Sequence, residues 1–404
     1  VELRYPEMSY AQPLDGGRAG IAYRDLGRTV DGLGADGPAW RRLMEPLVRH
    51  VPAVVEAALS DKRSIPSDLL TTAQFGLAVL DQGSRLWDRR WQDDAAPALL
   101  TGVAAHSISR LPSLAASGTA IMLGALAHAP GWPLPVGGSQ AIVDALVADL
   151  RAHGGEVATG VEVTAFAELP DAQAYLFDTT PRALLGIMGE RLPAGYRRAV
   201  ERFHYGNGAA KVDFVLSGQV PWANDEVGRA GTIHVGGTRA EMAFAEAEVA
   251  AGRHAERPVV LASDPAVFDP ARAVGGLRPL WAYTHVPAGS TLDIGAAVQA
   301  QLERFAPGFG DLVVERRTIP AAQLAEHNAN YIGGDISAGA VNVWQVFARP
   351  TPRWNPYATP VPGVYLCSSS TPPAPGVHGM CGVHAAKRAL RARFGVKRLP
   401  SLAP

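Results

Sequence analysis

The first third of the chain carries apolar residues at helical spacing. They recur every three or four positions, at Trp40, Leu43, Met44, Leu47 and Val48. This spacing predicts an amphipathic helix from Trp40 to Leu59. From 65 to 130, further apolar segments are broken by prolines and glycines and predict more helices. We expect this third to form a mainly helical lobe that covers or faces a substrate.

A β-hairpin is predicted ahead of these helices. Two strand-like runs flank Asp15-Gly16-Gly17, and Asp-Gly between such runs is a strong turn signal. After the hairpin, Gly32 to Gly37 read GLGADG and match the dinucleotide-binding pattern G-x-G-x-x-G. The residues before it are polar and broken by glycine, so no buried strand leads into it. We therefore interpret GLGADG as a turn, with Asp36 as N-cap and Pro38 in the first turn of the next helix.

The pattern changes near residue 132 to an alternation of helix and strand. Ile142, Leu146 and Leu150 share one stripe of a predicted helix that ends at His153-Gly154-Gly155. Strands are then predicted at Glu156–Val163 and Ala174–Asp178, which indicates an α/β layer. A second sheet-and-helix region follows, with strands at 209–217, 232–236, 258–262 and 280–285 and helices at 239–251 and 293–305.

Composition narrows the class of protein. Hydrophobic residues make up 47% of the chain, enough for a large core, and 37 basic residues balance 38 acidic ones. Without a basic block, nucleic acid is not an expected partner. Cys367 and Cys381 match no zinc or redox spacing and predict buried free thiols, in keeping with a reducing cytoplasm. The most apolar run, Ala120–Ala127, is too short to span a bilayer, which leaves only peripheral membrane contact open.

The C-terminal segment carries the clearest candidate chemistry. A short apolar run, Val364–Cys367, is followed by a loop of Ser, Pro and Gly and then by an alanine-rich helix. A strand, a small-residue loop and a helix N-terminus together form an anion site, because unpaired N–H groups point outward. Gly376 and Gly379 would let the backbone approach a flat ligand closely. From spacing alone, a bound cofactor and a purely structural crossover remain equally open.

This segment resembles the C-terminal flavin-binding motif of phytoene desaturase and amine-oxidase-like FAD-dependent oxidoreductases. The matching positions are Tyr365-Leu366-Cys367, Thr371, Pro373, Gly376-Val377, Gly379, Gly382 and Ala385-Ala386. Gly137-Gly138 and the helix after it are similar to the family's Gly-Gly helix, and Asp178–Pro181 resembles a strand end of its FAD domain. The stretches Asn330–Asp335, Arg349-Pro350 and Tyr357–Pro360 look like the phytoene-dehydrogenase-like branch.

The resemblance implies a two-lobed α/β fold of the glutathione-reductase-like, amine-oxidase type that binds FAD. It divides the chain into a substrate or lid lobe (1–130), FAD domain (131–190), substrate domain (191–344) and C-terminal FAD domain (345–404). The implied cofactor-binding residues are Val163, Ser368, Thr371, Pro372, Gly376, Val377, His378, Gly379 and Met380. The implied reaction is hydride transfer from an apolar or amine-like substrate to flavin, with no catalytic side chain assigned and no oligomeric state specified.

Three departures from the family pattern bear on this expectation, and one of them is a very short loop after Val163. Ser368, Ala374 and Pro375 replace glycines of the motif, which would alter contacts to the flavin edge. The family's βαβ unit with the true G-x-G-x-x-G is not among the 404 residues, so we expect an N-terminally truncated FAD domain. A non-catalytic flavin-fold protein that binds a hydrophobic ligand or a partner is therefore an alternative.

Several other residues have rival interpretations. Gly137-Gly138-Ser139-Gln140-Ala141 nearly matches the esterase elbow G-x-S-x-G, but prolines precede it, and we interpret Ser139 as a helix cap. His378 and His384 do not share a helix face, and no metal site is predicted. His378 either lies near the flavin or is a solvated or capping residue. Four aromatic residues either wall a hydrophobic pocket or belong to the core: Trp281, Tyr283, Tyr331 and Trp344.

Overall fold

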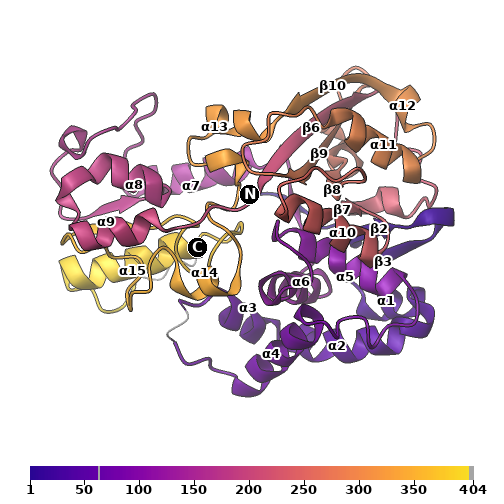
Figure 1. The fold of residues 1–404 in the computed structure, drawn as a ribbon, viewed down its shortest axis with the longest axis horizontal. Helices are drawn as coiled ribbons and strands as arrows, with labels where there is room; N and C mark the ends of the chain where they lie inside the picture. The colour runs from indigo at the N-terminus through magenta and orange to yellow at the C-terminus, as the bar shows by residue number, and fades with distance from the viewer. Residues whose placement is uncertain (62–63, 400–404) are drawn as a thin grey trace.

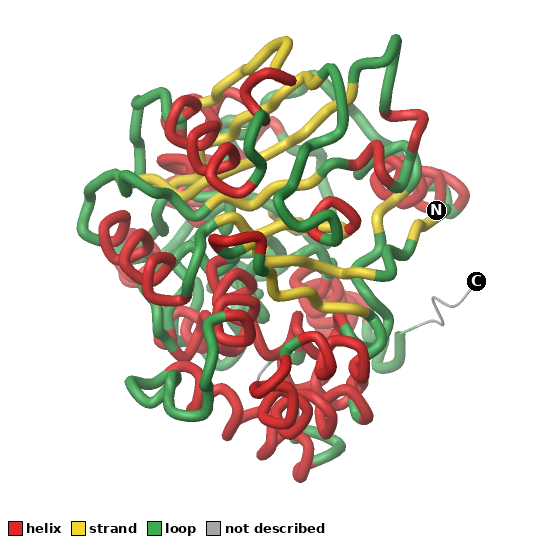
Figure 2. The backbone as a smooth tube through the Cα atoms, turned by 90° about the vertical axis from the view of Figure 1, so that its right-hand side faces the viewer, coloured by secondary structure: helices red, strands yellow, loops and turns green. Residues whose placement is uncertain are grey.

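The computed structural model describes residues 1–61 and 64–399, arranged around a seven-stranded mixed sheet (Figure 1). The strands follow the order β10-β6-β9-β8-β7-β2-β3, and only β2 and β7 run parallel. Their bounds are β2 (Met8–Pro13), β3 (Ala19–Tyr23), β6 (Gly208–Leu216), β7 (Ala230–Val235), β8 (Val260–Ser263), β9 (Arg278–Val286) and β10 (Val313–Ile319). Figure 2 shows the strands as a twisted layer with a helical lobe on one side.

The hairpin and four strands predicted from alternation are confirmed. β2 and β3 pair in antiparallel register around Asp15-Gly16-Gly17, where Gly16 and Gly17 both have φ +73. Glycine accepts this left-handed backbone without strain, which explains the turn. The four strand segments from 209 to 285 correspond to β6, β7, β8 and β9. Edge strand β10 was not predicted, because Glu315, Arg316 and Arg317 interrupt its apolar pattern.

The two faces of the sheet bury different cores. One face, with Phe214, Leu280 and Ala282, packs with Val298 and Leu302 of α11 (Gly295–Phe305). On the other face, Tyr10 belongs to the core of the helical lobe. The helices of that lobe are α1 (Leu26–Gly32), α2 (Gly37–Arg49), α3 (Val51–Leu59), α4 (Leu69–Gly83), α5 (Ala95–Ala105) and α6 (Leu114–Ala127). The alternation of side chains along each strand thus divides the protein into layers.

The single helix predicted from Trp40 to Leu59 is wrong, because the chain breaks at His50 into α2 and α3. His50 leaves the helical conformation, with φ −123 and ψ 34, and Pro52 occupies the first turn of α3. A proline at that position cannot donate to a preceding turn and starts a new helix readily.

GLGADG is a helix-to-helix turn, as predicted. Gly32 ends α1 and Gly37 begins α2, with one short 3₁₀ turn between them and no strand before them. The proposed capping role of Asp36 is wrong. Its buried carboxylate accepts hydrogen bonds from the backbone N–H groups of Gln92 and Asp93, at 2.8 and 2.9 Å. Asp36 therefore anchors the segment before α5 and leaves α2 without a side-chain cap.

A second unit with its own core lies beside the helical lobe (Figure 1). Strands β5 (Tyr175–Phe177) and β11 (Val364–Leu366) pair in parallel at its centre. Around them lie α7 (Gln140–Ala152), α8 (Pro181–Met188), α9 (Ala194–Glu201) and α15 (Met380–Phe394). The remaining elements are β1 (Leu3–Arg4), β4 (Leu134–Pro135), α10 (Arg239–Ala250), α12 (Phe309–Leu312), α13 (Leu324–His327) and α14 (Val343–Ala348).

The strand predicted at Glu156–Val163 is wrong. In the described part of the chain this segment pairs with no strand, and its side chains are exposed except for the half-buried Val163. The preceding helix α7 matches its prediction, yet buries none of its residues. Ser139 precedes α7 but makes no capping hydrogen bond, so its predicted role is also wrong. The four-part domain division stays a prediction, and its residues 400–404 lie outside the described residues.

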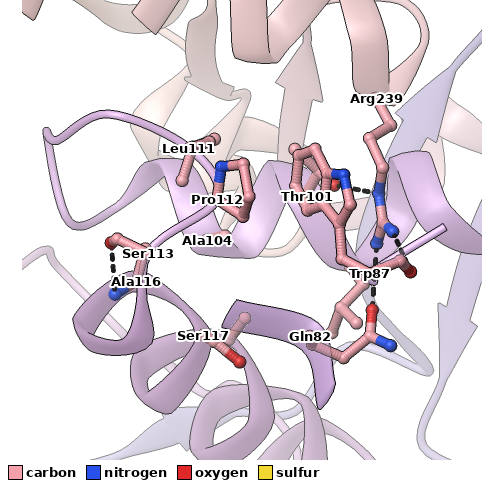
Figure 3. A pocket seen from close by; sticks show the side chains of 12 residues that line it. Gln82, Trp87, Thr101, Ala104, Leu111, Pro112, Ser113, Ala116, Ser117 and Arg239 are labelled. Carbon is pink, nitrogen blue, oxygen red and sulfur yellow. Dashed lines mark hydrogen bonds between the residues drawn. The ribbon is translucent and has the colours of Figure 1, made fainter. Parts of the chain in front are cut away.

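Arg239, the first residue of α10, connects the sheet to the helical lobe (Figure 3). Its buried guanidinium donates to the carbonyl of Trp87 at 2.7 Å, the hydroxyl of Thr101 at 2.9 Å and the side chain of Gln82 at 3.2 Å. It also lies 4.3 Å from the centre of the Trp87 ring. Burying a guanidinium is costly unless its donors are satisfied, and acceptors from three segments meet this need here.

We expect Arg239→Met to lower the free energy of unfolding by about 3–5 kcal/mol, because it leaves several buried acceptors without a donor. Urea titration followed by circular dichroism would measure the loss. Arg253→Met is the matched control, because Arg253 follows the same helix but pairs with Glu248 at the surface. The control should leave the unfolding midpoint nearly unchanged. Equal effects of the two substitutions would contradict the anchoring role.

His128 must be neutral to fit the helical lobe. Its Nδ1 donates to the carbonyl of Tyr23 at 2.7 Å, and its Nε2 accepts from the indole of Trp40 at 3.1 Å. Protonation of His128 at Nε2 would bring its new N–H against the indole N–H of Trp40, and neither group could accept a hydrogen bond. Burial lowers the pKa of His128 to about 4.

This lowered pKa predicts that stability decreases on acidification. Between pH about 6.5 and 4 the unfolded chain binds a proton at His128 that the folded chain does not, so His128 removes up to about 3 kcal/mol of stability over this window. His128→Gln keeps a donor and an acceptor but cannot titrate, and should reduce the pH slope by about one proton. His153→Gln removes an exposed histidine after α7 and is the matched control. Urea titrations across this pH range would test both variants.

Candidate functional site

The candidate site lies where the parallel strands β5 and β11 end. Parallel strands place their carboxyl ends at one edge, where ligands of open α/β sheets bind. Here the backbone N–H of Cys367 donates to the carbonyl of Phe177 at 2.9 Å. The hydroxyl of Ser368 donates to the carbonyl of Thr179 at 2.7 Å. These bonds join two loops that are far apart in the sequence.

The first part of the 367–379 loop is held from within. The hydroxyl of Thr371 donates to the carbonyl of Ser368 at 2.7 Å, and the Ser368 hydroxyl accepts from the N–H of Ser370 at 3.2 Å. The phenol of the buried Tyr357 donates to the carbonyl of Pro372 at 3.0 Å. The buried side chains of Ser368 and Thr371 therefore fix the loop, and their hydroxyls face protein rather than solvent.

The second part of this loop turns outward into α15. Val377 is 97% exposed, and its neighbours Gly376 and Gly379 are exposed as well. Gly376 has φ +154, and a Cβ there would meet the ring of His378 at 2.7 Å. Gly379 has φ +63 and precedes the first residue of α15, Met380. Glycine is thus needed at both positions for different reasons, one steric and one conformational.

His378 caps this turn. Its Nδ1 accepts a hydrogen bond from the backbone N–H of Met380 at 3.0 Å, which is one of the two roles expected from the sequence. Burial lowers the pKa of His378, so the ring is neutral and Nδ1 can accept. Nε2 is buried and faces protein rather than an open site.

The predicted cofactor residues thus fall into distinct groups. Ser368, Thr371 and Pro372 shape the loop, whereas Gly376 to Met380 present backbone at a helix N-terminus. A helix N-terminus attracts negative charge, because its N–H groups and dipole point the same way. Val163 lies apart from both groups in sequence, in the unpaired segment after α7. Binding of a cofactor by these residues remains a prediction.

Two buried charged residues behind the loop were not recognised from the sequence. Arg349 is fully buried and donates to the carbonyls of Ser369 at 2.7 Å and Gly339 at 3.0 Å. Asp335 accepts from the N–H groups of Gly206 at 2.7 Å and Gly339 at 2.8 Å. Burial lowers the pKa of Arg349 to about 10 and raises the pKa of Asp335, while each charge favours the ionised form of the other. Both residues lie in stretches that resemble the family, but nothing in the sequence indicated that they lie near each other.

A second polar cluster is buried between the sheet and the helical lobe. Nε2 of His106 lies 2.8 Å from Nε2 of His234, and the ring of Trp132 stacks on Tyr10 with centroids 4.7 Å apart. Burial lowers the pKa of His106 to about 4, which keeps it neutral. Single residues on separate elements carry no sequence signal, so this cluster was also missed.

The same face of the sheet carries a buried carboxylate–histidine pair, in which Nδ1 of His285 lies 2.6 Å from a carboxylate oxygen of Glu246. The imidazole nitrogen Nε2 of His285 has no partner among the described residues. Within the described residues, no group of three or more His, Cys, Asp and Glu side chains is placed to hold a metal ion.

The four aromatic residues singled out in the sequence do not surround one pocket. Trp281 and Tyr283 stack along β9 with ring centroids 6.4 Å apart, whereas Trp344 is largely exposed on α14. Cys367 and Cys381 are free thiols, as predicted, and burial raises the pKa of Cys367 to about 12. Neither thiol is therefore a reactive thiolate near neutral pH.

Sequence comparison relates the chain to oxidoreductase-domain proteins. Pyridine nucleotide-disulfide oxidoreductase domain-containing protein 2 of Rattus norvegicus is 25% identical over 355 residues, covering 75% of this chain and 59% of the rat protein. The Mus musculus protein of the same name is 41% identical over 86 residues, covering 21% of this chain and 15% of its own length. The chain thus spans less than two thirds of these relatives. No family model matches it.

Solved structures with a similar fold are oxidoreductases by name. A putrescine oxidase variant redesigned in its cofactor binding superimposes with a TM-score of 0.55 at 13% identity, over 98% of this chain and 82% of its own. An oxidoreductase from Methanosarcina mazei gives 0.53 at 13% identity, over 96% and 82%. Cyclohexylamine oxidase from Brevibacterium oxydans gives 0.51 at 12% identity, over 98% and 82%. The chain therefore has the two-lobed α/β fold of amine-oxidase-type oxidoreductases.

Proposed function

We propose that the protein is a FAD-dependent oxidoreductase that takes hydride from an apolar or amine-like substrate. The observation that carries the proposal is the outward-facing backbone from Gly376 to Met380, which enters α15 at the carboxyl ends of two parallel strands. The oxidoreductase names of the relatives and the amine-oxidase-type fold support it. The phytoene-dehydrogenase-like branch remains part of the proposal.

The residues present fit a flavin. Gly379 leaves room for a flat ring, because nothing lies within 4 Å of the place where its Cβ would be. When bound, FAD would supply the hydride acceptor. The N-terminus of α15 would stabilise the negative charge that develops on reduction, through its N–H groups and dipole. Ser368 and Thr371 would keep this turn fixed through their internal hydrogen bonds.

The surface around α7 supports a further part of the proposal. The outward stripe of α7, with Leu146 and Leu150, is exposed, and residues 156–163 leave their backbone unpaired among the described residues. A partner for this region must offer both an apolar surface and strand hydrogen bonds. A βαβ nucleotide-binding unit offers both, and we propose that such a unit completes the FAD site here.

The alternative is a flavin-fold protein without catalysis. Ala374 is buried and adopts φ +94, where the family motif has glycine, so this turn is strained. If the loop shifted to relieve this strain, the residues that would bind the cofactor would move, and cofactor binding would weaken. The esterase alternative has less support, because Ser139 is exposed before α7 and the described contacts join it to no histidine.

We expect the full-length protein purified from expressing cells to show the visible bands of oxidised flavin, which a reductant bleaches. Gly379→Val should lower the flavin content at least about tenfold, because a side chain there blocks approach to the N-terminus of α15. Gly395→Val is the matched control. Gly395 caps the other end of α15 with φ +69 and equally open surroundings, so the backbone strain is the same.

The outcomes separate the hypotheses. A colourless protein that FAD does not reconstitute would overturn the proposal. Bound flavin that no apolar or amine substrate reduces would favour the non-catalytic alternative. Equal flavin loss in both glycine variants would show that helix strain, rather than contact with the cofactor, matters. Ester cleavage that disappears in Ser139→Ala would instead support the esterase.

A further inference from the structure

Helix α4 presents its apolar residues to solvent. Its outward positions are Leu69, Leu70, Ala73, Leu77 and Leu80, and the four leucines are 65, 71, 66 and 55% exposed. Its buried positions are Thr71, Ala78 and Gln82. A helix on the surface of a soluble lobe normally turns its apolar stripe to the core and its polar side outward. α4 does the reverse, so its leucines are not explained by packing within the protein.

The charges around α4 are distributed unevenly. No residue from Leu69 to Leu80 is charged. Of the carboxylates near α4, Asp61 pairs with Arg388 and Asp81 with Arg90, both at 2.5 Å. Asp68, at the N-cap of α4, accepts from the N–H of Thr71 at 2.9 Å and from its hydroxyl at 2.6 Å.

Two basic residues follow the helix. Arg85 and Arg89, directly after α4, are exposed and make no ion pair among the described residues. The C-terminal end of the uncharged apolar stripe is therefore bordered by two unpaired arginines.

Two further elements of this part of the protein carry exposed apolar residues. Ile65, in the α3–α4 connection, is 84% exposed. On α14, Val343, Trp344 and Phe347 are exposed, and both α14 and α4 pack on α6 (Figure 1). Exposed tryptophan and phenylalanine beside leucine are typical of helices that lie at a membrane–water interface.

We propose that the α4 surface, formed by Ile65, Leu69, Leu70, Leu77 and Leu80, docks on an anionic lipid bilayer. α4 would lie in the plane of the interface, with its leucines among the acyl chains and the flanking basic residues at the headgroups. None of the described helices is long and apolar enough to cross a membrane. This proposal does not depend on FAD binding.

Vesicle flotation of the full-length protein tests the proposal. We expect the protein to float with phosphatidylcholine vesicles that contain about one-third phosphatidylglycerol, and less with phosphatidylcholine alone. Leu77→Gln/Leu80→Gln should weaken partitioning at least about tenfold, because two leucines no longer enter the acyl region. Arg85→Gln/Arg89→Gln should reduce the preference for phosphatidylglycerol.

The matched control is Val274→Gln/Leu292→Gln, which removes two exposed apolar residues from loops of the sheet region. It should float like the unsubstituted protein. Failure of the unsubstituted protein to bind either vesicle would overturn the proposal, as would equal flotation of the control and the α4 variant. A dimer in sedimentation velocity that Leu77→Gln/Leu80→Gln dissociates, without vesicle binding, would assign the surface to a second copy instead.

Discussion

The buried guanidinium of Arg239 is the interaction on which the arrangement of the two largest cores depends. α10 follows β7 directly, so Arg239 starts from the sheet and reaches acceptors that precede and belong to α5. Burial lowers its pKa only to about 10, so it stays charged near neutral pH. The buried charge of Arg239 favours the arrangement of helical lobe and sheet in which the N–H donors of its guanidinium are satisfied. The apolar contacts of both cores add stability, but they are far less directional.

The second unit is held to this frame by polar contacts. His384 of α15 lies 3.0 Å from the carbonyl of Leu59, and Arg388 pairs with Asp61, so α15 is bound to the end of α3. On the opposite side of the motif, Arg349 holds the carbonyls of Ser369 and Gly339. The loop from 367 to 379 is therefore fixed at its base, while its outer turn is free to meet a ligand. Such an arrangement suits a site that must be preorganised yet open.

Turn residues and apolar runs predicted most of the sheet. β6 and β9 alternate between buried and more exposed residues, whereas β2 and β8 are buried along their whole length and were indicated by the turn at Asp15-Gly16-Gly17 and by the apolar run 258–262. Edge strand β10 buries little and was missed, whereas segment 156–163 has no partner strand and was wrongly predicted as a strand. The turn into α15 was readable because Gly376 and Gly379 mark backbone that other residues cannot adopt. The burial of Arg349 and Asp335 behind the loop could not be predicted, because it depends on the tertiary fold.

The apolar surfaces of α4 and of α7 are both exposed, and they differ in whether the backbone hydrogen-bonding groups beside them are paired. The backbone of α4 is satisfied within its own helix, so a medium without hydrogen-bonding groups can cover its leucines at no polar cost. Residues 156–163 beside α7 leave N–H and C=O groups unpaired in the described structure, and a bilayer interior would leave them so. Water satisfies that backbone while it is exposed, and a strand edge could satisfy it if a protein covered α7. The lipid proposed at α4 and the protein unit proposed at α7 thus differ in the hydrogen bonding that each must supply, rather than in hydrophobicity.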